Sequence, residues 1–485
     1  MEEIRFPEPD QVLKEKPSLK KYLRYFLFFG PGAIIASVTI GQGQLILGPQ
    51  IGAWAQDRLL WIITLSFGSY FIAYVAIRFT LISGINLVDL FALKLKGALN
   101  WFFIALIIIF IPMFAATIIT TLGISLQWIF GFDSSLVVVW GTYFGILAVM
   151  FVILWRYKII EYTQAFFVVV LAAGAVASMV SSVMAGQLNI LKAIPHFFTI
   201  GDIPSYPSWV PESISGKPIF LTILGYLGTL TVTIITVVGY SGWIKVKKWG
   251  IFKKRGDANK LSEKLFERFK EKGRIDYLPE DKKEIRKAKL LVTPALVDLM
   301  LAYIIVAIVS AAYMLGGYAW LGRAHLIPTD ANPLEAQAEI FRNIAKSMSN
   351  WLVPLFKISL FFALFGTIYA GFEAASRMLY ETMKGVVPKI RKIEYKQFAF
   401  YVFAYLFLIG IPLAVAIFTR ILSLLTILGL TLLVIGVIGV IIYGAGALYY
   451  TQKVLPEPYR LGKAGMAIAI LSLIFMAIPF IFIFR

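Results

Sequence analysis

Apolar residues dominate the chain in long runs that short polar segments separate. Most runs reach the roughly 20 residues that a helix needs to cross a hydrocarbon core of about 30 Å. We therefore expect an all-α polytopic membrane protein. The pattern predicts eleven spans, near residues 22–53, 59–82, 100–126, 135–154, 161–185, 218–248, 291–316, 350–376, 397–418, 421–448 and 464–484.

The first predicted span, residues 22–53, is too long for one straight crossing. An unbroken helix of that length would run roughly 48 Å at about 1.5 Å per residue. The predicted interruption is Gly41-Gln42-Gly43-Gln44, because glycines permit non-helical backbone and amides supply donors and acceptors. Freed backbone groups in a bilayer need protein or a polar cavity to satisfy them, so a break at this depth predicts a binding site.

The sixth predicted span contains a second candidate for an interruption. Near its middle, Gly228 is followed by Thr229, Thr231, Thr233 and Thr236. Threonines can bond back to their own helix and be purely structural, but β-branched residues beside a glycine also suit a break. Both interpretations stay open at this point.

An odd number of spans with breaks in the first and sixth matches two inverted five-helix repeats and one extra helix. This arrangement suits alternating access better than a channel, although a pore can also be lined by glycines, amides and hydroxyls. The predicted organisation is a cytoplasmic tail at 1–21, a first repeat at 22–185, an outer loop at 186–217, a second repeat at 218–448 with a basic cytoplasmic insertion at 244–290, and an eleventh span at 464–484.

The composition supports this class and orients the chain. Hydrophobic residues make up 59% of the 485 residues, and the mean hydropathy is +0.80. With a cytoplasmic N-terminus, the inner segments hold 37 Lys and Arg and the outer segments hold eight. The positive-inside rule therefore accounts for the net charge of +19 and predicts a plasma-membrane protein with its C-terminus outside.

The insertion at 244–290 contains an amphipathic stretch with Leu261, Leu265, Phe266 and Phe269 on one face. Packing beneath the membrane domain or on the inner leaflet is its simplest role. A membrane scaffold that acts through this insertion is an alternative function. Nucleic acid is not an expected partner, because acidic residues alternate with the basic ones.

Two charged residues near the ends of predicted spans are candidates for coupling or gating. Asp298 lies about two turns into the seventh span, and Arg78 lies at the inner end of the second. A charge at depth usually faces a cavity. For Asp298, a role in capping or joining helices is an equal alternative.

Catalysis has no chemical basis in this sequence. The chain has no Cys, and its two His residues, His196 and His325, lie in polar loops. A serine nucleophile, such as Ser241 in Gly239-Tyr-Ser-Gly242, therefore lacks a base within reach. Zinc-protease and P-loop motifs are also missing, so we predict neither an enzyme nor a cofactor.

The first predicted span contains Gly30-Pro-Gly, eight residues, then Gly41-Gln-Gly-Gln44. Leu59-Leu-Trp61, Arg78 with Ser83-Gly84, and Asp298 follow in order. These segments resemble the Nramp (natural resistance-associated macrophage protein) family of divalent-metal transporters, whose first span reads Gly-Pro-Gly, eight residues, Asp-Pro-Gly-Asn. The resemblance implies a LeuT-type fold with broken helices 1 and 6 and an eleventh span.

At the positions of the family's metal ligands this chain differs. Gly41 and Gln44 replace the Asp and Asn, Val232-Thr233-Ile234 stands near the family's Met-Pro-His, and the acidic residues of span three are missing. Hard cations favour carboxylates, and transition metals also favour N or S ligands. The resemblance therefore implies a transporter of a partly hydrated divalent cation, or alternatively of a small organic solute or anion.

The predicted site lies between the two interruptions, in contact with the transported ion or solute and surrounded by lipid bilayer. Gln44 and Gly41 are the candidate metal ligands. The predicted substrate-binding residues are Ile40, Gly41, Gln42, Gln44, Thr229, Thr231, Val232 and Thr233.

Overall fold

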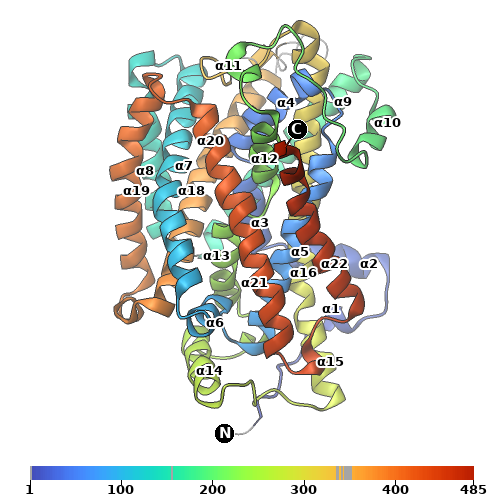
Figure 1. The fold of residues 1–485 in the computed structure, drawn as a ribbon, viewed down its shortest axis with the longest axis vertical. Coiled ribbons are helices and arrows are strands. Elements are labelled where there is room, and N and C mark those ends of the chain that lie inside the picture. The colour runs from blue at the N-terminus through green and yellow to red at the C-terminus, as the bar shows by residue number, and fades with distance from the viewer. Residues whose placement is uncertain (1–2, 155–156, 335–337, 340–341, 343–351, 485) are drawn as a thin grey trace.

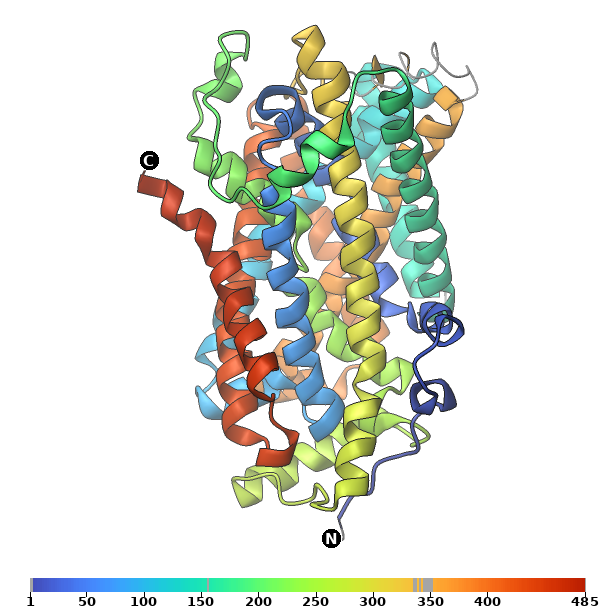
Figure 2. The same ribbon diagram turned by 90° about the vertical axis from the view of Figure 1, so that its right-hand side faces the viewer.

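The computed structural model describes residues 3–154, 157–334, 338–339, 342 and 352–484. In these residues all regular secondary structure is helical. The helices form an elongated bundle (Figure 1), with the N-terminus, α14 (Ala258–Lys272) and α15 (Lys282–Leu291) at one end. We call this the basic end and the opposite one the far end; the C-terminus lies toward the far end (Figure 2).

Ten helices in the described part of the chain are long and apolar enough to cross a membrane, or up to eleven if one bent pair counts as a span. The second to eleventh predicted spans coincide with these helices. They are α5 (Trp61–Ser83), α7 (Ala98–Phe130), α8 (Val137–Leu154), α9 (Tyr157–Met184), α12 with α13 (Ile219–Leu230, Ile234–Lys247), α16 (Thr293–Gly316), α18 (Leu352–Val386), α19 (Tyr395–Phe418), α20 to α21 (Leu424–Leu432, Gly439–Val454) and α22 (Lys463–Ala477).

The first span begins later than predicted. Residues 19–28, which form α2 (Leu19–Arg24) and one further turn, bend by 73° from α3 (Pro31–Thr39). Gly30 precedes Pro31, the first residue of α3. A proline at this position loses no hydrogen bond, because the first N–H groups of a helix have no partner within it. Leu19, Leu23 and Leu27 are highly exposed. Residues 22–29 therefore lie outside the straight crossing.

The first span is interrupted, as predicted. The break is at residues 40–41, two residues earlier than the centre of the predicted interruption at 41–44. Ile40 and Gly41 are non-helical, and Gln42 already belongs to the next helical segment. A π-helical turn, Gly43–Leu47, then leads into α4 (Gly48–Ala55). The crossing therefore consists of α3 and α4 with a break between them.

The sixth span is also interrupted. The threonines that follow Gly228 therefore mark a break in this span, which the sequence had left open. Between α12 and α13, Thr231 and Thr233 have extended backbone, with ψ values of 155° and 161°. Broken first and sixth spans thus face each other inside the bundle.

The predicted amphipathic helix in the insertion is α14, which packs on the bundle. Leu265, Phe266 and Phe269 are buried. Below them, Tyr277 donates a hydrogen bond from its hydroxyl to the carbonyl of Ser83 at 2.6 Å. The N-terminal segment also packs here, since the Phe6 N–H donates to Glu284 at 2.5 Å. The basic end is therefore covered by folded chain.

Short helices complete the described structure in the connections. They are α1 (Gln11–Lys14), α6 (Leu87–Lys94), α10 (Ile190–Ala193) and α11 (Glu212–Ser215).

Candidate functional site at the two helix breaks

A small cavity lies where the two broken helices meet. Its volume is about 20 Å³, enough for about one water molecule. We call it the central cavity, and every residue around it is buried. Its lining consists of Val38, Thr39, Gln42, Gly43, Phe114, Gly228, Thr229, Thr233, Ile235, Thr367, Leu432 and Ile435.

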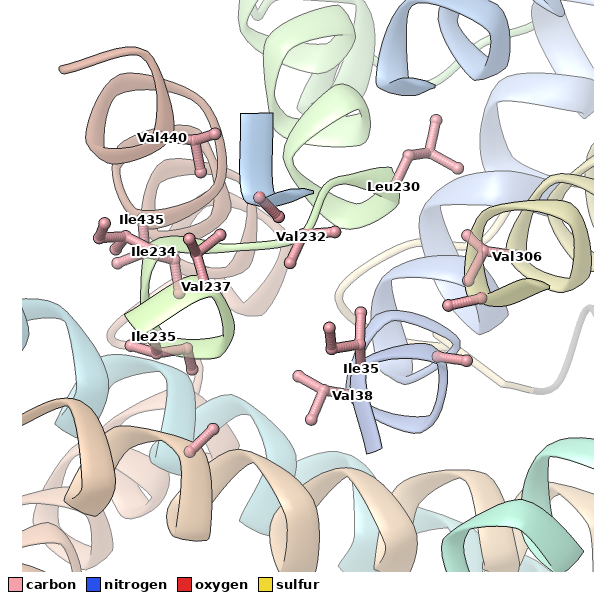
Figure 3. Packing of buried hydrophobic residues seen from close by; sticks show 14 of the residues in the cluster. Ile35, Val38, Leu230, Val232, Ile234, Ile235, Val237, Val306, Ile435 and Val440 are labelled. Atoms are coloured by element: carbon pink, nitrogen blue, oxygen red, sulfur yellow. The ribbon is translucent and has the colours of Figure 1, made fainter. Parts of the chain in front are cut away.

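Apolar side chains fix the break in the sixth span against its neighbours (Figure 3). Val232 lies on the extended link between α12 and α13, and Ile35 and Val38 lie on α3. All three are at most 7% exposed. Because the surroundings are apolar, the few polar groups at the breaks must find partners within the protein.

Gln42 joins the first break to α7. Its Nε2 donates to Thr117 Oγ1 at 2.7 Å, and its Oε1 accepts from Thr121 Oγ1 at 3.3 Å. The Thr117 hydroxyl donates in turn to the carbonyl of Phe114, and the single proton of the Thr121 hydroxyl is shared between Gln42 and the carbonyl of Thr117 at 2.7 Å. Gln42 is 1% exposed and lines the central cavity.

Gln44 joins the same break to α12. Its Nε2 donates to Thr229 Oγ1 at 2.9 Å, and its Oε1 accepts from the Tyr226 hydroxyl at 3.3 Å. Gln44 is fully buried beside the cavity but does not line it. In this conformation its carbonyl oxygen is therefore engaged by the protein.

The two predicted residues in the middle of the second break are committed to neighbouring helices. Thr231 Oγ1 lies 2.9 Å from the carbonyl of Gly436 in span ten, and the Val232 N–H donates to Ser69 Oγ in α5 at 3.0 Å. Of the predicted residues in this span, Thr229 and Thr233 line the cavity.

The glycines of the first break allow close approach to other helices. A Cβ at Gly41 would lie 2.4 Å from Thr367 Oγ1, and a Cβ at Gly43 would lie 2.4 Å from Thr229 Cγ2. No side chain fits at either position without displacing a helix. Ile40, beside them, is fully buried and adopts the turn conformation that ends α3.

Sequence reasoning missed several lining residues. Thr39 is the last residue of α3, and Thr367 is the α18 residue that faces the break, with its hydroxyl 3.4 Å from the carbonyl of Ser37. Thr39 directly precedes the predicted break, so its position was a usable signal. Thr367 and Phe114 come from distant spans, and nothing local distinguishes them.

The cavity is electrically neutral in its side chains. Its polar lining is made of hydroxyl and amide groups, together with backbone at the C-terminal ends of α3 and α12, whose last carbonyls lack partners within their own helices. In the described part of the chain, no three His, Cys, Asp or Glu residues form a group that could hold a metal ion. The site can therefore offer a cation neutral oxygen atoms only.

Asp298 lies away from the cavity and closes the start of α3. Its two carboxylate oxygens accept from the N–H groups of Gly30 and Gly32, each at 2.7 Å, and from the Tyr240 hydroxyl at 2.5 Å. A Cβ at Gly32 would come within 2.6 Å of this carboxylate. The carboxylate thus ties α16 to α3 and α13 near the basic end, which fits the capping alternative.

Arg78, the other predicted gating residue, also lies away from the cavity. It lines a wide cleft at the basic end and donates to the carbonyl of Arg460 at 3.0 Å.

A second, partly open pocket lies farther along α12 toward the far end. Its volume is about 40 Å³, and Leu47, Gln50, Thr222 and Gly225 are among its lining residues. Gln44 and Tyr226 line neither space. In both segments they fall between residues that line the central cavity and residues that line the second pocket, and their side chains are hydrogen-bonded to each other.

Two facing broken helices around a buried polar space, within a bundle of apolar helices, are the features of the LeuT-type fold. Solved structures agree. A mutant of the manganese transporter of Eremococcus coleocola matches with a TM-score of 0.67 at 15% identity, over 96% of this chain and 88% of that one. MhsT in complex with L-phenylalanine matches with a TM-score of 0.52 at 15% identity, over 93% and 97% of the two chains.

A third structure, the nucleobase-cation-symport-1 family transporter Mhp1 with bromovinylhydantoin bound, matches with a TM-score of 0.51 at 14% identity, over 94% of this chain and 90% of that one. Among curated proteins, none matches this chain. The family model for natural resistance-associated macrophage protein-like proteins matches residues 32–483. The chain therefore belongs to the Nramp family of metal-ion transporters and is not an enzyme.

Proposed function

We propose that this protein moves a partly hydrated divalent cation across the plasma membrane by alternating access, and that the ion passes through the central cavity. The observation that carries the proposal is a buried space at two facing helix breaks, lined by hydroxyl and amide oxygens. Family membership supports a metal ion as the substrate.

The donor set favours a hard cation. Mg²⁺ and Ca²⁺ prefer oxygen ligands, whereas transition metals gain from N and S ligands. Without a carboxylate at the cavity, the ion would keep several of its waters, and Mg²⁺ gives up water most reluctantly. Mg²⁺ is therefore the first ion to test.

The proposed ligands come from both breaks. Gln42, Thr229 and Thr233 would contact the ion or its waters directly, since they line the cavity. Gln44 would contribute its Oε1 once the bond to Tyr226 opens, and the carbonyls of Ile40 and Gly41 would face the ion as the break widens. Thr231 and Val232 would hold the frame through their bonds to spans ten and two.

Alternating access requires two closures that open in turn. Toward the basic end, the contacts of Asp298 with α3 and α13 are the proposed closure. Toward the far end, the proposed closure is the bond of Tyr226 to Gln44, between the central cavity and the second pocket. The N-terminus and the insertion share the basic end (Figure 2), which supports a cytoplasmic position for that end and an outer position for the C-terminus.

Uptake of Mg²⁺ into liposomes, followed with an entrapped Mg²⁺-sensitive dye, tests the proposal. We expect Gln42→Leu to reduce uptake about tenfold or more, because it removes an oxygen from the cavity without a replacement. Gln397→Leu makes the same change on the exposed surface of α19 and should leave uptake intact. Uptake by Gln42→Leu equal to that of the unmodified protein would overturn the assignment of this site.

Gln42→Glu distinguishes a cation from the alternative of a small organic solute or anion. A carboxylate in the cavity should strengthen Mg²⁺ binding in calorimetry and weaken that of small carboxylates such as acetate. Heat from acetate but not from Mg²⁺ or Mn²⁺ in the unmodified protein would favour the alternative. The cavity volume of about 20 Å³ admits neither an organic solute nor an ion with several waters, so the cavity must widen during transport of either substrate.

The scaffold alternative can be tested through the insertion. Its helix α14 buries its apolar face on the bundle, which leaves the polar face for a partner. Replacing basic residues on that exposed face should leave Mg²⁺ flux intact in a transporter. If the same replacement abolished the pull-down of a partner protein and left Mg²⁺ flux unchanged, the result would favour the scaffold.

A further inference from the structure

A wide cleft at the basic end plays no part in the proposed transport path. It lies between the inner end of α5, the junction of α15 and α16, the end of α21 and the start of α22, and its volume is about 800 Å³. Figure 2 shows α22, in red, at the edge of the bundle beside α5. The cleft therefore opens at the perimeter of the protein, close to where the spans end.

Positive charge dominates the cleft. Among its lining residues are Arg78, Lys289, Arg460 and Lys463, against the single carboxylate of Glu457. Within the described residues, none of these side chains lies within ion-pair distance of an opposite charge. Clustered basic side chains without counter-ions repel one another, so an anion between them would be stabilised.

Arg78 is the strongest indication of a ligand. The residue is only 7% exposed. It donates to the carbonyl of Arg460 at 3.0 Å and also interacts with the hydroxyl of Tyr74, another residue that lines the cleft. A guanidinium has five N–H donors in a planar fork that matches two oxygens of a phosphate. Both partners of Arg78 are neutral oxygen atoms, and the guanidinium keeps donors for an anion beside them.

Further donors belong to residues that line the cleft. The Nε2 of Gln452, which lines the cleft, is buried and has no hydrogen-bond partner. The helix α22 begins at Lys463 with Gly462 as its N-cap, so no side chain satisfies its first N–H groups. A helix N-terminus attracts anions through these groups and through its dipole.

We propose that this cleft binds the phosphate of an anionic lipid headgroup from the leaflet at the basic end. The lipid source follows from the position, since the cleft opens beside α22, which exposes Ile468, Leu471 and Ile474. Such apolar side chains would lie along the acyl chains while the phosphate enters the cleft. Basic pockets between membrane helices bind acidic headgroups in this way. This site does not depend on the nature of the transported substrate.

Lipid binding to the purified full chain in neutral detergent tests the proposal. The melting temperature is measured with added phosphatidylglycerol, phosphatidylcholine or inorganic phosphate. We expect phosphatidylglycerol to raise it and phosphatidylcholine to leave it unchanged. Stabilisation by inorganic phosphate with none by phosphatidylglycerol would overturn the lipid source and assign the cleft to a soluble oxyanion. Equal responses to both lipids would overturn the site.

A pair of double variants locates the binding. Lys289→Gln with Lys463→Gln removes two charges from the cleft but keeps Arg78 in place. Lys389→Gln with Lys396→Gln removes two exposed charges outside it. We expect about tenfold weaker phosphatidylglycerol binding for the first pair and a change below about twofold for the second. Equal weakening by both pairs would mean diffuse attraction to the basic end and would overturn the cleft.

Discussion

The two helix breaks meet at one cavity but are held open differently. At the first break, long amide side chains on the broken segment itself reach out, Gln42 to α7 and Gln44 to α12. At the second break, the groups that bond outward are the Val232 N–H and the hydroxyl of Thr231, to spans two and ten.

This difference assigns different tasks to the two breaks. An amide side chain can rotate about its own bonds and exchange a protein partner for an ion, whereas a backbone N–H moves only with the chain. In the proposed transport cycle, the first break would therefore supply the adaptable amide ligands. The second break would supply a fixed frame and the hydroxyls of Thr229 and Thr233. The glycines at the first break serve packing, because Gly41 and Gly43 admit Thr367 and Thr229 to within van der Waals distance of the backbone.

Gly43→Val should have the largest effect on this arrangement. Its Cβ would lie 2.4 Å from Thr229 Cγ2, so α12 would have to move away. We expect a loss of about 1–3 kcal/mol in stability and abolished Mg²⁺ uptake, measured by thermal unfolding and in liposomes. The control is Gly429→Ala, where an added Cβ meets nothing within 4 Å. Full uptake by Gly43→Val would show that the breaks need not touch.

Gln44→Leu should destabilise the protein more than Gln42→Leu. Without Gln44, the buried Tyr226 hydroxyl loses the acceptor it has here, which costs about 1–3 kcal/mol. Without Gln42, Thr117 and Thr121 keep acceptors in their own helix. Unfolding curves of both variants give the comparison. Equal destabilisation would mean that the two amides do not differ as described.

Ser69→Ala tests the frame of the second break. It leaves the Val232 N–H without this acceptor and should cost about 1 kcal/mol. Ser66→Ala is a matched control in the same helix, since Ser66 Oγ bonds to the carbonyl of Ile63. We expect a lower melting temperature for the first variant only. A similar decrease in melting temperature for both variants would mean that removal of any serine hydroxyl from α5 is destabilising, and that the bond to Val232 has no special role.

The smallest expected effect is that of a pH gradient on Mg²⁺ uptake. Both breaks contribute neutral groups, and none of the residues that line the central cavity titrates near neutral pH. An imposed pH gradient should therefore change the initial rate of Mg²⁺ uptake by less than about twofold. A large stimulation by inward acidity would show that a titratable group outside the cavity takes part in transport.

Much of the architecture was predictable because each crossing must be long and apolar. The apolar runs located ten crossings, and the excess length of residues 22–53 required a break. The bend between α2 and α3 was missed, although Gly30-Pro31 was a local signal for it. At the site, Gln42, Thr229 and Thr233 line the cavity between the two breaks, and their role in binding stays a prediction.

The sequence by itself determined the class of protein, since hydropathy acts on each segment alone and a bilayer tolerates few alternatives to helices. Tertiary structure decided what each polar residue does. Asp298 holds the start of α3 against α16, because three donors from α3 and α13 converge on its carboxylate. The cavity and the basic cleft likewise join residues hundreds of positions apart, and no local pattern encodes such contacts.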